Sequence, residues 1–214
     1  MNKTFKTLAL TALAGALAGC AMAPSSDQVD AATQQIIKSS FREQGIAKLN
    51  WLEQDASNKA CSEAQGKELD PKLAKAIEAA NLKTVKMPSD GVFLGDWKAG
   101  EKIAQNGRGM TWSDKAGSAN GGSCYNCHQV SKEELSFGSI GPSLYNYGKI
   151  RGVTDPAAAA SKPIVEYTWS KMWNSKAFNA CSGMPRFGHA GILDEKQMRD
   201  VMALLLDPKS PVNQ

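Results

Sequence analysis

The chain has 214 residues and a formal net charge of +4, with 42% apolar and 21% charged residues. This composition supports a folded core and excludes an intrinsically disordered chain. Two of the positive charges, Lys3 and Lys6, lie at the extreme N-terminus, and nothing in the remainder resembles the dense basic patch of a nucleic-acid-binding protein. The length fits one domain of ordinary size with an addition, or two small domains.

The first residues have the pattern of an export signal. The positive start precedes an apolar stretch at residues 8–18, which is too short for a permanent membrane-spanning helix. The sequence L-A-G-C that ends at Cys20 resembles the lipobox of bacterial lipoproteins. We therefore expect a signal peptide at residues 1–19 and lipidation of Cys20, with secretory cleavage after Ala23 as the alternative. Both place the chain in the periplasm, and they differ in whether a lipid anchors it to a membrane.

Residues 20–87 form the next predicted part, a helical N-terminal extension. Residues 71–80 begin with a proline and carry apolar side chains at helical spacing, which predicts a short helix. The extension is too small for a generous core of its own, so we expect it to pack on the rest of the chain or on a partner. The turn-forming residues 88–91 separate it from the second predicted part, residues 88–214.

A helix is predicted from Asp96 to about Gln105, and one glycine in it is informative. Gly100 shares a face with Trp97 and Ala104. Glycine inside a helix costs stability, so it indicates that another helix crosses closely at that point.

The strongest signal is the C-x-x-C-H motif of Cys124, Cys127 and His128. Two thiols at this spacing can bond both vinyl groups of one haem, and the next imidazole can bind its iron. One alternative is a redox-active C-x-x-C, which belongs in an α/β fold. The other is structural zinc, which needs four ligands, whereas His189 is the only other histidine. The motif therefore predicts one covalent haem c.

A turn after the motif offers a partner for the imidazole. A histidine bound to metal usually donates its other ring N–H to a carbonyl group. Pro142 lies in such a turn with a stiff backbone, so its carbonyl is a plausible acceptor. A simple turn is the alternative.

Two further helices complete the predicted domain. The segment 163–177 is rich in aromatic residues, which we expect in the core and the haem wall. The last helix begins at Asp194 with Gln197 as a capping box. Its apolar stripe is Met198, Val201, Met202 and Leu205, and Pro208 stops it.

Met184 is the predicted sixth ligand of the iron. It follows Gly183 and precedes Pro185 in an irregular segment, where a side chain can approach a metal without breaking a helix. Methionine is a common partner of histidine in electron carriers and raises the potential. The rival ligand is His189, which would lower it. Most other methionines lie in tails or loops before the motif or at core spacing.

The remaining cysteines form one candidate pair. The chain has five; with Cys20 assigned to lipid and two assigned to haem, Cys61 and Cys181 remain. An oxidising compartment favours a disulfide between them, and two separate buried thiols are the alternative. Arg151 and Arg186 are candidate partners of haem propionates, with solvated surface charge as the other interpretation.

Four ordered motifs resemble those of the SoxX family: G-D-W at 95–97, C-Y-N-C-H at 124–128, G-P-S-L at 141–144 and M-P-R-F-G at 184–188. SoxX proteins are monohaem cytochrome c subunits of the SoxAX thiosulfate-oxidising complex. The first three motifs are general to class I cytochromes c, and the last is closer to SoxX.

The resemblance implies an all-α, class I cytochrome c-like domain and a role in sulfur oxidation. It implies a heterodimer with a SoxA-type cytochrome subunit, together an L-cysteine S-thiosulfotransferase that oxidatively joins thiosulfate to a cysteine of a SoxY-type carrier. The present chain would be its non-catalytic electron-transfer subunit, with His128 and Met184 on the iron and a soluble cytochrome c as electron acceptor. A free-standing periplasmic monohaem carrier is the alternative, and the N-terminal extension favours a partner.

Overall fold

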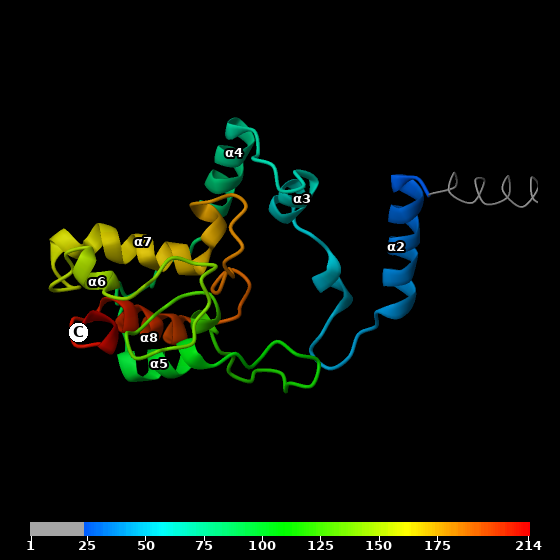
Figure 1. The fold of residues 1–214 in the computed structure, drawn as a ribbon. Coiled ribbons are helices and arrows are strands. Elements are labelled where there is room, and N and C mark those ends of the chain that lie inside the picture. Colours follow the sequence, from blue (N-terminus) through cyan, green and yellow to red (C-terminus); the bar gives the residue numbers. More distant parts are fainter. Residues whose placement is uncertain (1–23) are drawn as a thin grey trace, which may run out of the picture. The chain divides into compact units, whose positions relative to one another are not determined.

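The computed structural model describes residues 24–214 and shows a helical protein (Figure 1). Within that range there is no β-strand, only an isolated bridge between Gln44 and Ala47, which confirms the all-α prediction. None of the helices described is long and apolar enough to cross a membrane. The chain divides into two compact units between residues 42 and 43. The predicted signal peptide and Cys20 lie outside the described residues.

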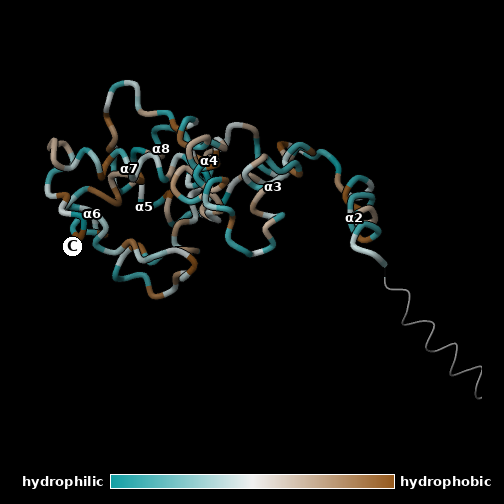
Figure 2. The backbone as a smooth tube through the Cα atoms, turned by 90° about the horizontal axis from the view of Figure 1, so that it is seen from above, coloured by the Kyte–Doolittle hydropathy of each residue, from teal (hydrophilic) through white to brown (hydrophobic). Residues whose placement is uncertain are grey.

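The first unit contains the helix α2, Ser26–Ser40. A capping box between Ser25 and Gln28 begins it. Hydrophilic and hydrophobic residues are mixed along it (Figure 2), and none of its described residues is buried. Its apolar side chains Val29 and Ile36 are 47% and 61% exposed. Local capping therefore supports this helix more than tertiary packing does.

The second unit holds all the other elements that the structure describes, and its helices are labelled in Figure 1. Its α-helices are α3 Ala56–Glu63, α4 Pro71–Leu82, α5 Trp97–Gln105, α6 Tyr147–Ile150, α7 Lys162–Trp173 and α8 Glu195–Leu206. Its 3-10 helices are η1 Leu49–Leu52, η2 Cys124–Asn126, η3 Ala159–Ser161, η4 Ser175–Ala177 and η5 Pro211–Asn213.

The helices α5 and α8 cross at Gly100. A methyl group at Gly100 would overlap the backbone carbonyl of Asp200. Next to the crossing, the backbone N–H of Gly95 donates to the carbonyl oxygen of Arg199 at 2.8 Å, and that of Asp96 donates to the carboxylate of Asp200 at 2.9 Å. The close approach predicted from the glycine is confirmed.

The core of this unit lies where α8 meets α5 and α7. Met198, Val201, Met202 and Leu205 of the predicted stripe are all buried, and the capping box of Asp194 and Gln197 is present. Trp169 of α7 is fully buried, and Phe93 contacts it edge to face with ring centroids 5.7 Å apart.

The other aromatic residues in and just after α7 divide between core and surface. Trp173 packs partly buried against the core. Tyr167 and Phe178 instead pack on each other, 39% and 37% exposed. The expected core position is therefore confirmed for Trp169 and Trp173 but not for Tyr167, which lies on the outer side of α7.

The predicted helix 163–177 is interrupted at Asn174, so α7 ends at Trp173 and η4 follows. Asn174 has an extended backbone and is fully buried. Its side-chain amide donates to Asn81 Oδ1 at 3.0 Å and to Thr84 Oγ1 at 2.9 Å. These bonds satisfy a buried amide and join α4 to η4, so tertiary contacts override the helical pattern.

Residues 43–87 belong to the same compact unit as the haem motif. Ile77 of α4 is buried, and the indole N–H groups of Trp169 and Trp173 donate to the carbonyl oxygens of Lys86 and Thr84 at 2.8 Å and 3.1 Å. This part of the extension therefore packs on the rest of the chain, one of the two outcomes expected for it.

Candidate functional site

The C-x-x-C-H motif folds into one tight turn after α5. The backbone N–H groups of Cys127 and His128 both donate to the carbonyl oxygen of Cys124, at 3.1 Å and 2.9 Å. Just before it, the N–H groups of Gly122 and Ser123 donate to carbonyl oxygens at the end of α5 at 2.8 Å and 3.0 Å. The end of α5 therefore anchors the residues just before the motif, and the turn that follows holds the two thiols and the imidazole close together.

Both thiols of the motif are free and partly buried. Burial raises the pKa of the Cys124 thiol to about 12, and the neighbouring Cys127 adds to the rise. A redox-active C-x-x-C needs a thiolate, which requires a lowered pKa. The buried thiol and the absence of a strand among residues 24–214 both oppose the thioredoxin-like alternative.

The zinc alternative also lacks support. Nowhere in residues 24–214 do three or more His, Cys, Asp or Glu side chains form a group that could hold a metal ion. A structural zinc site needs four such ligands. The two thiols and His128 alone are therefore too few to complete a structural zinc site.

His128 is oriented by the turn at residues 141–144. Its Nδ1 lies 2.6 Å from the carbonyl oxygen of Pro142. A carbonyl oxygen can only accept, so Nδ1 carries the proton and Nε2 of the neutral ring carries the lone pair. The N–H of Gly141 donates to the carbonyl oxygen of Cys127 at 2.8 Å, and a side chain at Gly141 would overlap the imidazole. The turn therefore fixes both the tautomer and the plane of the ring.

Met184 lies in an irregular loop between η4 and α8, residues 181–189, which we call the Met184 loop. The Met184 side chain is partly buried and packs against the same core cluster as Cys124 and Leu144. Its carbonyl oxygen accepts a hydrogen bond from Ser175 Oγ at 2.6 Å, and its N–H donates to Ser182 Oγ at 3.3 Å.

His189, the rival ligand, lies at the end of the same loop and is exposed. It borders a cavity of about 340 Å³ lined by Lys83, Thr84, Lys86, Trp173, Gly188 and His189. Partial burial and the charge of Arg186 lower the pKa of His189, with Asp55 opposing them. Neither Met184 nor the haem motif lines this cavity.

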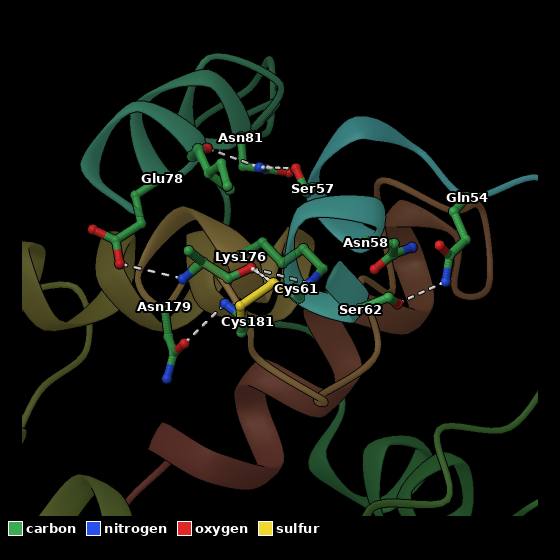
Figure 3. The surroundings of a disulfide bond; sticks show 12 residues. Gln54, Ser57, Asn58, Cys61, Ser62, Glu78, Asn81, Lys176, Asn179 and Cys181 are labelled. Atoms are coloured by element: carbon green, nitrogen blue, oxygen red, sulfur yellow. Dashed lines mark hydrogen bonds between the residues drawn. A yellow bond between two sulfur atoms is a disulfide. The ribbon is translucent and has the colours of Figure 1, made fainter. Parts of the chain in front are cut away.

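The structure joins Cys61 and Cys181 in a disulfide with Cα atoms 5.5 Å apart (Figure 3). Cys61 lies in α3, and Cys181 begins the Met184 loop. The bond connects positions 120 residues apart in the chain. It therefore joins the extension to the loop that carries the candidate ligand.

The two candidate propionate partners have other contacts. The guanidinium of Arg186 lies 2.6 Å from a carboxylate oxygen of Asp55. That of Arg151 stacks on the ring of Tyr147, 3.8 Å from its centroid. Sequence analysis did not identify Asp55 or Ser175, because neither lies in a local motif that marks a contact with the Met184 loop.

The residues of the motif fit a covalently attached haem. The thiols of Cys124 and Cys127 are unpaired with each other, and Nδ1 of His128 is engaged by Pro142, which leaves Nε2 to bind iron. Gly141 leaves room for the ring of His128. When bound, a haem c supplies reversible one-electron transfer at iron.

Comparison with known proteins agrees with this chemistry. An uncharacterized lipoprotein of Aquifex aeolicus (strain VF5) is 36% identical over 132 residues, which are 61% of this chain and 58% of that protein. The chain thus spans less than two thirds of the length of this relative. Residues 98–208 match the cytochrome c family, which is more than half of the chain. The match includes the C-x-x-C-H turn, the Met184 loop and most of α5 and α8, and the chain belongs to the cytochrome c family.

Proposed function

We propose that this chain is an exported monohaem cytochrome c that transfers single electrons. The observation that carries the proposal is the turn that places Cys124, Cys127 and the oriented imidazole of His128 together. The sequence contains one C-x-x-C-H motif, which supports one haem per chain. Haem proteins of this family are electron carriers, so the cofactor provides the redox chemistry and the chain tunes it.

The chain's own residues have four roles in this proposal. Cys124 and Cys127 form the thioether bonds, and His128 Nε2 binds the iron from one side. The carbonyl oxygen of Pro142 accepts a hydrogen bond from the N–H at Nδ1, which makes the imidazole a stronger ligand. The Met184 thioether would be the other side-chain ligand of the iron, and a thioether raises the potential relative to a second histidine.

The finer assignment is that the chain is the electron-transfer subunit of a SoxAX-type L-cysteine S-thiosulfotransferase. The motif M-P-R-F-G at residues 184–188 supports it. In this assignment the chain forms a heterodimer with a SoxA-type cytochrome subunit, receives electrons when thiosulfate is joined to a SoxY-type carrier, and passes them to a soluble cytochrome c.

A free-standing periplasmic carrier is the second candidate, and one observation favours it. Residues 43–87 pack on the haem-motif unit and are bonded to the Met184 loop through Cys61. This part of the extension therefore has an intramolecular role, which weakens its value as a sign of a partner.

We propose that the chain is exported and attached to a membrane by a lipid on Cys20. The L-A-G-C sequence supports this, and the name of the Aquifex relative describes that protein as a lipoprotein. We also propose a functional division into a signal peptide at 1–19, the helical extension at 20–87 and a haem-binding domain at 88–214.

Purification from a host that attaches haem to exported proteins tests the central proposal. The mature chain should show a reduced pyridine spectrum typical of two thioether bonds, with one haem per chain. A folded chain without a Soret band overturns the proposal. Mass spectrometry of the N-terminus tests acylation, and Cys20→Ser should move the protein from the membrane fraction to the soluble fraction.

Purification from the native cells separates the two candidates. A second haem polypeptide that stays bound through gel filtration, together with thiosulfate-dependent reduction of the chain's haem, supports the SoxAX assignment. A chain that elutes alone and is not reduced by thiosulfate supports the free-standing carrier.

A further inference from the structure

The N-terminal extension is bonded to the Met184 loop at two positions that flank the candidate ligand. Cys181, three residues before Met184, forms the disulfide with Cys61. Arg186, two residues after Met184, pairs with Asp55 at 2.6 Å. The loop is thus bound on both sides of the residue whose side chain must reach the iron.

Both contacts from the extension come from a single helix. Asp55 is the N-cap of α3, and its side chain accepts a hydrogen bond from the N–H of Asn58 at 2.8 Å. Cys61 lies in the body of the same helix (Figure 3). Because α3 is a hydrogen-bonded helix, its two contacts set a fixed distance between the two ends of the loop segment they bind.

The loop is also bonded on its other side, to η4 and α4. The fully buried Ser175 donates from Oγ to the carbonyl oxygen of Met184 at 2.6 Å. The buried ammonium of Lys176 donates to the carbonyl oxygen of Ala180 at 3.1 Å, and the N–H of Ala180 donates to Glu78 at 3.3 Å (Figure 3). The backbone around Met184 is therefore held between two packed parts of the unit.

A thioether ligand gains from such support. Methionine has a flexible side chain, and its sulfur is an uncharged ligand. A methyl group at the adjacent Gly183 would meet no other atom within 4 Å, so packing at this position does not restrain the backbone next to Met184. Phe187 is buried and its N–H donates to the carbonyl oxygen of Met172 at 3.1 Å, which holds the loop after Met184. Without the contacts from α3, the residues before Met184 would gain conformational entropy each time the thioether left the iron, and this entropy would favour the unbound state.

We propose that residues 55–63 of the extension are a positioning element for the axial ligand, acting through Asp55–Arg186 and Cys61–Cys181. The inference rests on the proposed function, since it takes Met184 as the ligand of iron. Asp55, Cys61 and Cys181 do not touch the haem in this scheme. They reduce the population of the state in which Met184 has left the iron.

The experiment measures how often that ligand is absent. Carbon monoxide binds ferrous haem only when the sixth position is open, so its association rate reports the open fraction. The iron–sulfur absorption band of the ferric protein reports the closed state. Both are measured on the full-length haem protein as wild type and as the double variant Cys61→Ser/Cys181→Ser.

The double variant should bind carbon monoxide about tenfold faster than wild type or more, because it loses the covalent restraint three residues before Met184. A tenfold change is about 1.4 kcal/mol, which is the conformational entropy cost of ordering about one residue. The variant Asp55→Asn keeps a good N-cap but loses the charge, and should bind about twofold to threefold faster, as expected for a half-exposed ion pair. Asp70→Asn, the same change at the N-cap of α4, is the matched control and should match wild type.

Circular dichroism shows whether each variant is folded. If the double variant does not fold, Asp55→Asn carries the test of the extension with the disulfide intact, and Ser175→Ala measures the separate contribution of η4. Ser170→Ala is the control for Ser175, because Ser170 is also buried and donates to a backbone carbonyl, that of Glu166.

The outcomes separate this inference from the proposed function. A wild-type protein without the iron–sulfur band overturns Met184 as the ligand, and the inference with it. A wild type with the band, together with folded variants that bind carbon monoxide at the wild-type rate, overturns the positioning role alone.

Discussion

The Nδ1 atom of His128 lies 2.6 Å from the carbonyl oxygen of Pro142, and this pair determines what the imidazole can do. A carbonyl oxygen forces the proton onto Nδ1, so Nε2 is the nitrogen left free to bind a metal. Proline has no backbone N–H of its own, and its ring restricts the backbone that presents the carbonyl group. The two residues are 14 positions apart, and Gly141 brings them together.

Gly141→Ala should displace the imidazole of His128. The added methyl group would overlap the ring atoms of His128, and the turn is bonded to Cys127 and cannot simply move away. We expect a chain that incorporates less haem and has an altered Soret spectrum, measured by the ratio of haem to protein. Gly183→Ala is the control, because a methyl group there meets nothing; equal haem content in both variants would contradict the role of Gly141.

Met184→Ala should abolish the iron–sulfur band of the ferric protein and leave the covalent haem in place. The reason is that the two thioether bonds do not depend on the sixth ligand. The measurements are the visible spectrum and the reduced pyridine spectrum. His189→Ala should keep the band, since His189 is exposed and lies at the end of the loop. A band that survives in Met184→Ala but disappears in His189→Ala would reverse the assignment.

Features that depend on neighbours a few residues away could be predicted from the sequence. The capping box at Asp194, the stripe of α8 and the C-x-x-C-H turn are of this kind. The crossing at Gly100 is predictable because a glycine within a helix is costly unless a neighbouring helix needs the space of a side chain. Pro142 could be named because its turn follows the motif in order.

Contacts between distant positions could not be predicted in the same way. Asn174 fits a helical pattern, but its amide binds Asn81, which is 93 residues away, and so the helix ends early. Asp55 looks like an ordinary N-cap, and only the folded chain places Arg186 beside it. Cys61 and Cys181 are the exception, because counting cysteines leaves them as the one remaining pair.

Gly100→Ala should destabilise the protein although alanine is the better helix former. Helix propensity favours alanine by about 1 kcal/mol. The added methyl group, however, would overlap the backbone of Asp200, and overpacking a tight contact costs about 1–3 kcal/mol or more. We expect a net loss of about 1–2 kcal/mol and a Tm lower by about 2–8 °C, measured by calorimetry. Lys102→Ala, on the exposed face of α5, should leave Tm nearly unchanged; a higher Tm for Gly100→Ala would contradict the close crossing.

Tyr147 should make the folded state less stable at alkaline pH. Burial raises the pKa of Tyr147, while its hydrogen bond with Thr168 and the charge of Arg151 act in the opposite direction. The unfolded chain releases this proton near pH 10, about the ordinary pKa of tyrosine. The folded chain holds it to higher pH, so the stabilisation is complete below about pH 10 and is lost as the pH rises towards the raised pKa.

Tyr147→Phe removes this titration and should flatten the fall in denaturation midpoint above about pH 10. At neutral pH it loses the 2.9 Å hydrogen bond with Thr168, at a cost of about 1 kcal/mol. That cost is limited because Thr168 Oγ1 still donates to the carbonyl oxygen of Ile164 at 2.7 Å. Urea unfolding at a series of pH values is the measurement, with Tyr145→Phe as the control, because Tyr145 is only partly buried. An equally steep alkaline fall in Tyr147→Phe and wild type would show that Tyr147 is not the group responsible.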